Sequence, residues 1–370
     1  MNYIIVGAGI LGASTAYHLA SKGEKVAIVD RGEGGQATRN AAGIICPWLT
    51  NRTSKDWYQL AVNGAGYYPE LVEQLKEAGI SEPGYKRVGA LNIFDTEEKL
   101  DRKAAYAEMR KMETPEMGEI SKLSPKETRE MFPPLAEHYR SLHLSGAGRV
   151  NGSRITESLL KAAERKGAEV IHGNASLRTY KGEIQGVDID GVPQHADQII
   201  LTNGSWMREL FAPSALSPRV TFEKAQIIHL HLTGQATEHW PVLLPPFSYY
   251  MLGFEEGKLV VGATKEKVQE HDSRVTAGGI HQLLEKALRT APGLKEAAYV
   301  ETKVGFRPFT PGSLPVFGRL PNQPHILAAN GLGASGLTSG PFVGAQLAAL
   351  AAGEDTSMDI SPYTIDRLFK

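Results

Sequence analysis

The chain has 370 residues, of which 42% are hydrophobic, and a formal net charge of -1, so it can bury a large core and divide into two domains of ordinary size. The balanced charge, with no basic run interleaved with aromatic residues, argues against a nucleic-acid partner. The single cysteine, Cys46, excludes an intrachain disulfide and an all-cysteine zinc site. Because the first strand is expected at Tyr3, leaving no room for a secretory leader, we expect a cytoplasmic protein without a transmembrane segment.

The first thirty residues follow the pattern of a dinucleotide-binding fold. An apolar run at 3–6 is typical of a strand buried on both faces, and the next six residues match G-x-G-x-x-G. Gly7 permits the tight turn, Gly9 lets a pyrophosphate approach the backbone, and Gly12 lets the following helix pack on the strand. That helix, expected to reach about residue 21, would present the N–H groups of its first turn to the phosphates, which makes its first residues candidates as well: Ile10 and Leu11.

A second strand, expected at 25–29, ends at an acidic residue. Asp30 is placed to accept hydrogen bonds from a ribose 2'-OH and would repel a 2'-phosphate. We include the neighbouring Arg31 among the cofactor-binding candidates. The pattern predicts a dinucleotide, but by itself it does not distinguish NAD from FAD.

A run of small and polar residues at 34–45 would let an extended ligand lie against the backbone. This segment resembles the one that follows the dinucleotide fold in the D-amino-acid oxidase superfamily of FAD-dependent amine oxidoreductases, which includes glycine oxidase, sarcosine oxidase and D-amino-acid dehydrogenase. In that superfamily the segment contacts the FAD pyrophosphate and the flavin ring. The resemblance gives this role to Thr38, Arg39, Asn40, Ala41, Ala42, Gly43 and Ile44.

Further segments are similar to the same superfamily and occur in the same order. A helix expected over 156–166 leads to Val170, which the resemblance places beside the adenine. The strand that begins near 196 ends in a sequence similar to Ala-Gly-x-Trp, and residues 305–318 resemble the signature G-x-R-P-x-T-P...L-P-x-x-G. From the former we add three cofactor-binding candidates: Asn203, Gly204 and Trp206.

The loop at 331–338 resembles the segment that closes over the flavin, and it precedes an apolar helix expected over 336–353. Its N–H groups and the helix dipole would stabilise negative charge on the N1–C2 side of reduced flavin. Residues 332–335 are apolar or small, whereas glycine oxidase-like enzymes carry larger polar or basic residues there, so a strict preference for glycine is not expected. The candidates in this loop are Gly333, Ser335, Gly336, Leu337 and Thr338.

The order of these segments implies an α/β fold with a discontinuous, Rossmann-type FAD-binding domain. We assign 1–85, 146–217 and 301–370 to that domain. The substrate domain, 86–145 and 218–300, is expected to be α+β with a mainly antiparallel sheet, because its alternating runs are typical of such strands. Those runs lie at 226–232, 249–252 and 258–261, and surface helices are expected at 97–112 and 280–291.

Two side chains are candidates for substrate binding. Arg307 occupies the arginine of the G-x-R-P signature, and its planar guanidinium can bind a carboxylate through two parallel hydrogen bonds. Arg307 also lies in a segment expected to contact the cofactor and is therefore a cofactor-binding candidate as well. The alternative interpretation of Arg307 is a structural ion pair at the domain boundary. Tyr250 falls where glycine oxidase-like enzymes place a tyrosine that hydrogen-bonds the carboxylate, while Tyr249 would point to the opposite face of its strand. For Tyr250 the alternative is packing with a satisfied hydroxyl.

Two further features, the single cysteine and a pair of histidines, are interpreted as structural rather than functional. The cysteine that tethers flavin in sarcosine oxidase lies in the C-terminal third of that protein, and Cys46 does not, so we expect FAD to be bound non-covalently and Cys46 to be a small buried residue. His229 and His231 share one face of a strand, but no carboxylate or cysteine lies at ligand spacing. We therefore predict no metal site.

The resemblance implies oxidative deamination of a small amino acid (a D-amino acid, glycine, sarcosine or a related amine). Hydride would pass from carbon to flavin N5 and water would hydrolyse the imine. Either O2, giving H2O2, or another acceptor would reoxidise the flavin. Three alternatives stay open: oxidation of a 2-hydroxy acid or alcohol on the same fold, a flavin-bearing subunit of a heteromeric dehydrogenase, and an NAD-dependent dehydrogenase. A homo-oligomer is equally compatible with the sequence.

Overall fold

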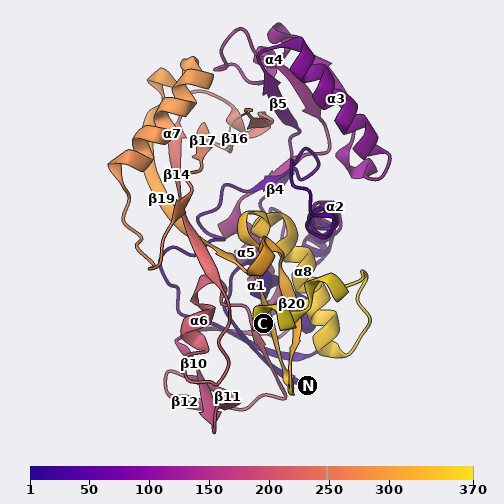
Figure 1. Ribbon diagram of the computed structural model, residues 1–370, viewed down its shortest axis with the longest axis vertical. Helices are drawn as coiled ribbons and strands as arrows, with labels where there is room; N and C mark the ends of the chain where they lie inside the picture. The colour runs from indigo at the N-terminus through magenta and orange to yellow at the C-terminus, as the bar shows by residue number, and fades with distance from the viewer. Residues whose placement is uncertain (247–248, 370) are drawn as a thin grey trace.

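A six-stranded sheet forms the lower half of the molecule in the computed structural model, which describes residues 1–246 and 249–369 (Figure 1). Its strand order is β20-β21-β13-β1-β2-β9, in which β20 is antiparallel and the other strands are parallel. The central strand β1 is buried on both faces, as its apolar sequence predicts. The bounds are β1 Asn2–Val6, β2 Lys25–Asp30, β9 Glu169–His172, β13 Gln198–Leu201, β20 Val316–Leu320 and β21 Gln323–Asn330.

Helices α1, α5, α8 and α2 pack against one another beside this sheet (Figure 1). Small residues allow α1 and α8 to approach closely: a Cβ on Gly344 would lie 2.6 Å from Cβ of Ser14, and the Ser14 hydroxyl donates to the Pro341 carbonyl at 2.7 Å. The long apolar helix α8 ends at Gly353, whose φ of 76° is the left-handed conformation common at helix ends. The bounds are α1 Ile10–Ser21, α2 Lys55–Glu77, α5 Gly152–Arg165 and α8 Gly336–Ala352.

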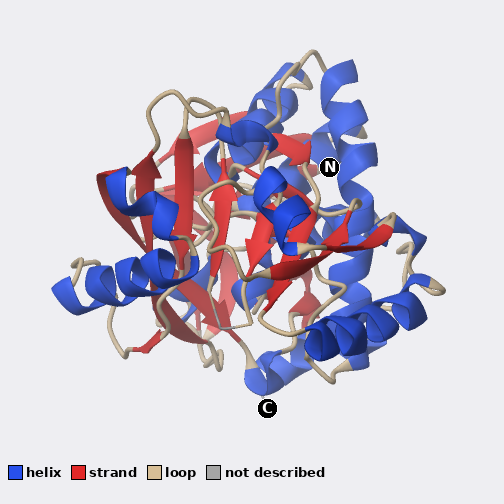
Figure 2. Ribbon diagram, turned by 90° about the horizontal axis from the view of Figure 1, so that it is seen from above, coloured by secondary structure: helices blue, strands red, loops and turns tan. Residues whose placement is uncertain are grey.

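A second, mainly antiparallel sheet forms the upper half, with the order β18-β14-β17-β16-β15-β5-β7-β6 and with β19 paired to β14. Only β15 and β5 pair in parallel. Figure 2, seen from above, shows helices on the outside of the sheets. The strands are β5 Ala90–Phe94, β6 Ile120–Leu123, β7 Arg140–Leu144, β14 Thr221–His231, β15 Val242–Leu244, β16 Tyr250–Gly253, β17 Lys258–Gly262, β18 Glu266–Lys267 and β19 Ala298–Phe309.

Smaller elements complete the fold. The sheet β3-β8-β4 connects the two halves, and β10-β11-β12 forms a projection at the lower end (Figure 1). Helices α3, α4 and α7 belong to the upper half, and α6 lies in the lower half. The bounds are β3 Ile44–Ile45, β4 Tyr85–Arg87, β8 Gly148–Val150, β10 Ala175–Tyr180, β11 Glu183–Ile189, β12 Val192–Gln194, α3 Glu97–Lys111, α4 Pro125–Met131, α6 Met207–Leu210 and α7 Ala277–Thr290.

The predicted fold class is confirmed, with two differences in local structure. Helix α5 begins at Gly152 rather than at 156, because the side chain of Asn151 accepts a hydrogen bond from the N–H of Arg154 and caps an earlier start. The 23-residue helix α2 was not predicted. It contains Pro69 and two glycines, which disfavour a helix locally. Its packing against α8 compensates: a Cβ on Gly64 would lie 2.3 Å from the Thr338 carbonyl oxygen.

Partly buried His18 on α1 makes stability depend on pH. Its Nε2 lies 2.9 Å from the Tyr67 hydroxyl, and burial lowers the pKa of His18 from 6.5 to about 4. The unfolded chain therefore binds one more proton between these values, so acidification across that window lowers the free energy of unfolding, by at most about 3 kcal/mol.

Denaturant unfolding from pH 7 to pH 4 measures this effect. We expect His18→Gln to flatten the pH dependence, whereas the surface change His281→Gln on α7 leaves it unaltered. An equal slope in wild type and His18→Gln would contradict the assignment.

Candidate active site

The glycine turn between β1 and α1 brings three backbone segments together. Gly7 has a φ of 99°, and a Cβ there would lie 2.9 Å from Cα of Asn203. A Cβ on Gly12 would lie 1.9 Å from the Gly7 carbonyl oxygen, so only glycine permits this approach of helix to strand. The Thr38 hydroxyl oxygen accepts the N–H of Ile10 at 3.1 Å, which ties the 34–45 segment to the start of α1.

Asp30 fixes the loop beside this turn. One carboxylate oxygen accepts the N–H of Ala8 at 2.7 Å, and the other accepts the N–H of Gly32 at 2.7 Å and Nε2 of Gln36 at 2.8 Å. A carboxylate has about four acceptor positions, so Asp30 retains capacity for a ligand hydroxyl. The predicted role of Asp30 in binding a ribose is compatible with these bonds.

A cavity lies over the glycine turn and the end of β2. The predicted residues that line it are Gly7, Gly9, Asp30, Arg31, Asn203, Gly204 and Trp206. The side-chain oxygen Oδ1 of Asn203 is buried and has no hydrogen-bond partner in the described part of the chain. Because a buried acceptor without a donor is costly, this atom fits a cavity that holds a ligand with hydroxyl or amino donors, as a dinucleotide has.

Some residues of this cavity were not predicted, and the predicted Val170 does not line it. Val170 is on β9 and 37% exposed, and the cavity is lined instead by the stretch that follows β9, residues 173–176. Gln36 and Glu209 also line it; Glu209 forms a bidentate ion pair with Arg31, at 2.7 and 3.1 Å. No local pattern marks Glu209, since only folding brings α6 to the end of β2.

Three of the remaining cofactor candidates, Ile44, Leu337 and Thr338, meet at or near the start of α8. The Thr338 hydroxyl donates to the Ile44 carbonyl at 3.0 Å, and the Tyr68 hydroxyl donates to the Leu337 carbonyl at 2.5 Å. A Cβ on Gly43 would lie 1.8 Å from the Val150 carbonyl oxygen. The other candidates share these segments: Leu11 in α1, Arg39, Asn40, Ala41 and Ala42 before β3, and Gly333, Ser335 and Gly336 before or at the start of α8.

The two substrate candidates meet on one face of the antiparallel sheet. Arg307 on β19 and Tyr250 on β16 interact: burial raises the pKa of Tyr250, and the nearby guanidinium of Arg307 opposes that effect only partly. The phenol therefore stays protonated and can donate. Tyr249 faces the other way, where its hydroxyl donates to the Lys286 carbonyl, as the alternation of a strand predicts.

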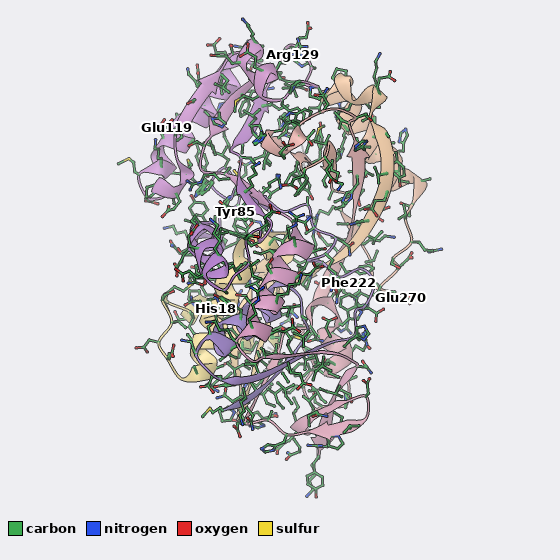
Figure 3. The ribbon with its side chains drawn as sticks, turned by 180° about the vertical axis from the view of Figure 1, so that it is seen from behind. His18, Tyr85, Glu119, Arg129, Phe222 and Glu270 are labelled. Carbon is green, nitrogen blue, oxygen red and sulfur yellow. The ribbon has the colours of Figure 1, made fainter. Side chains whose placement is uncertain are left out.

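This face lies against the segment that carries the cofactor candidates. The N–H of Phe306 donates to the Gly35 carbonyl at 2.9 Å, and a Cβ on Gly305 would lie 3.1 Å from Cβ of Asn40. Arg307, two residues beyond Gly305, is on the same face of β19. On the opposite face, Phe222 stacks on His271, at 4.1 Å between ring centroids, and Figure 3 shows Phe222 beside the loop that carries Glu270.

Cys46 and the two strand histidines take structural positions. Cys46 packs against the core, and burial raises the pKa of its thiol to about 12. Nδ1 of His229 lies 3.0 Å from a Glu301 carboxylate oxygen. No group of three or more His, Cys, Asp or Glu side chains able to hold a metal ion occurs among the described residues.

Removing the buried acceptor of Asn203 tests the cofactor cavity. We expect Asn203→Ala to lower the affinity of the apoprotein for FAD about tenfold, because one hydrogen bond of about 1.4 kcal/mol is lost. Titration with FAD, followed by flavin fluorescence, measures the affinity. Asn63→Ala on α2 is the control, and equal affinities in all three proteins would remove Asn203 from the site.

The thiol of Cys46 should resist modification. At pH 8 a thiol with a pKa of about 12 has only about one ten-thousandth in the reactive thiolate form. We therefore expect a neutral aromatic disulfide reagent to release no thiolate from the native protein and one equivalent after denaturation. Gln235→Cys, on an exposed turn, supplies the positive control; rapid labelling of native wild type would contradict the burial of Cys46.

Comparisons with known proteins agree with this geometry. An uncharacterized oxidoreductase of Bacillus subtilis (strain 168), YurR, is 54% identical over 98% of both chains. The glycine oxidase of Geobacillus kaustophilus is 27% identical and covers 98% of this chain and 96% of its own. Among solved structures, iminodiacetate oxidase (IdaA) from Chelativorans sp. BNC1 superposes with a TM-score of 0.94 at 43% identity and 98% coverage of both chains.

No helix in the described part of the chain is long and apolar enough to cross a membrane. The sequence profile of the DAO family, described as FAD dependent oxidoreductase, matches residues 2–350. This match shows that the chain belongs to the DAO family of FAD-dependent oxidoreductases.

Proposed function

We propose that this FAD-dependent oxidoreductase oxidises the carbon–nitrogen bond of a small amino acid. The observation that carries the proposal is that Arg307 and Tyr250 interact on the sheet face that lies against the 34–45 segment. A carboxylate held by this pair would have its amine-bearing carbon near the cofactor. The names of the relatives, glycine oxidase and iminodiacetate oxidase, support an amine as the substrate.

Each residue of the pair has a separate task. Arg307 would bind the carboxylate through two parallel hydrogen bonds and so fix the orientation of the substrate. Tyr250 would donate its hydroxyl to the same carboxylate, because its raised pKa keeps it neutral. When bound, FAD accepts a hydride and passes the electrons to O2 or another acceptor. We propose that the cofactor contacts the candidates around the glycine turn, the 38–44 loop and the start of α8.

We propose that the loop before α8 influences the size of the substrate side chain that the site accepts. Ser335 donates to the Leu332 carbonyl at 2.8 Å and is turned inward on its own backbone. A Cβ on Gly333 would lie 2.6 Å from the ring of Phe309. This loop therefore has no long polar side chain to fill the space above the flavin, and we propose that amines larger than glycine are accepted.

Removing the guanidinium tests the proposal. We expect Arg307→Ala to raise KM about 100-fold, because a charge-assisted bidentate contact of about 3 kcal/mol is lost, while the visible flavin spectrum stays unchanged. Arg307→Lys should recover only part of the loss, since lysine cannot form the planar pair.

The control is Arg102→Ala, a fully solvated helix position on α3. Steady-state kinetics and anaerobic reduction of the flavin by glycine, sarcosine, D-alanine and iminodiacetate provide the measurements. If none of these amines reduces the flavin, or if KM is unchanged in Arg307→Ala, the proposal is wrong.

A further inference from the structure

Glu223 on β14 is a carboxylate on the same sheet face as Arg307. Its Cα is the direct partner of that of Arg307 on β19, and opposite side chains of an antiparallel pair share one face, with Cβ atoms about 5 Å apart. The next pair on this face, Ala225 and Gly305, has almost no side chain. A Cβ on Gly305 would lie 3.7 Å from Cα of Ala37. Glu223 and Arg307 therefore lie beside the segment that carries the cofactor candidates.

Tyr250 belongs to the same face of the sheet. Gly262 on β17 pairs with both Ile227 and Tyr250. A Cβ on Gly262 would lie 2.6 Å from a methyl carbon of Ile227 and 2.9 Å from the Tyr250 hydroxyl, so both side chains lie where that Cβ would point. Ile227 and Glu223 are four residues apart on β14 and therefore point to the same side. Glu223, Arg307 and Tyr250 consequently share one face.

One oxygen of the Glu223 carboxylate has no partner from the protein. The side chain is 17% exposed, and its Oε1 lies 3.7 Å from Nζ of Lys265, whose side chain is 71% exposed; such a solvated ion pair contributes little. Oε2 is buried and accepts no hydrogen bond within residues 1–246 and 249–369. Burying a carboxylate oxygen without a donor is costly, so Oε2 needs a donor that the folded chain does not supply.

The two opposite residues make complementary demands on a ligand. The guanidinium of Arg307 offers only donors, and the carboxylate of Glu223 offers only acceptors. A ligand that satisfies both has an anionic acceptor and a cationic donor a few ångströms apart. The carboxylate and ammonium groups of an α-amino acid have this arrangement, because one carbon atom joins them. A hydroxyl in place of the ammonium group would give Glu223 a weaker, neutral donor.

We propose that Glu223 binds the amine nitrogen of the substrate and thereby selects amines, an inference that rests on the proposed function. The substrate carboxylate binds Arg307 and Tyr250, while the ammonium group donates to Oε2 of Glu223. Holding both groups prevents the α-carbon from rotating about its bond to the carboxylate, which fixes its orientation for reaction. Glu223 is therefore a specificity-determining residue whose role is recognition.

Three unreactive ligands test this assignment without turnover. 2-Aminoisobutyrate, 2-hydroxyisobutyrate and pivalate differ only in an ammonium, hydroxyl or methyl group on the α-carbon, and none has an α-hydrogen to lose. Titration calorimetry measures their binding to the FAD-loaded protein. We expect 2-aminoisobutyrate to bind at least about tenfold more tightly than pivalate, with the hydroxy acid between them. Equal affinities, or binding of none of the three, would overturn the inference.

Glu223→Gln removes the charge and keeps the shape of the side chain. We expect this variant to bind 2-aminoisobutyrate about tenfold more weakly and pivalate within about twofold of wild type, so that the preference for the amine is lost. The matched control is Glu301→Gln on the paired strand β19, because His229 and Lys303 already contact that carboxylate at 3.0 and 3.3 Å. An unchanged preference in Glu223→Gln, or weaker FAD binding with the preference intact, would contradict the assignment.

Turnover separates this inference from the proposed function. With the amine that reduces the flavin fastest, Glu223→Gln should lower kcat/KM at least about tenfold, while the inhibition constant of pivalate stays unchanged. If no amine reduces the flavin, the proposed function fails, and the three ligands still decide whether Glu223 binds an ammonium group. If an amine is oxidised with equal kcat/KM by wild type and Glu223→Gln, the proposed function stands and the inference is wrong.

Discussion

The contact between β19 and the 34–45 segment determines the geometry of the site. The N–H of Phe306 bonds to the Gly35 carbonyl, and Gly305 has no Cβ to hold Asn40 away. Since β19 pairs with β14 along its whole length, this one contact brings the face of the antiparallel sheet to the segment that follows the dinucleotide fold. The side chains that we propose bind the substrate then need no mobile loop to reach their positions.

On the same sheet face, Tyr250 and Arg307 both remain able to donate hydrogen bonds. Burial raises the pKa of Tyr250, so its hydroxyl remains a donor at physiological pH. Arg307 pairs in the sheet with Glu223, yet no salt bridge between their side chains occurs among the described residues, and the guanidinium interacts with Tyr250. A guanidinium already paired with a protein carboxylate would have to exchange that partner for the substrate, and the binding energy would fall accordingly.

The sequence predicted the parts of the molecule that local constraints determine. The glycine turn, Asp30 and the 38–44 segment depend on short-range backbone geometry, and the candidates Arg307 and Tyr250 came from the family resemblance. The sequence did not predict helix α2, because Pro69 argues against a helix and only packing against α8 overrides it. It also missed Glu209 and Glu223, whose relevance arises from strand pairing and from α6 meeting β2, and neither contact leaves a local pattern.

If Glu223 receives the substrate nitrogen, it also accounts for a choice between chemistries on this fold. A 2-hydroxy acid offers Arg307 the same carboxylate, but its hydroxyl gives Glu223 a neutral donor in place of a charged one. Charge-assisted hydrogen bonds are about twice as strong as neutral ones, and a site built around a buried polar group rejects analogues that leave it poorly paired. The amine would then be selected at the binding step, before the cofactor acts, by a residue that need take no part in the redox chemistry.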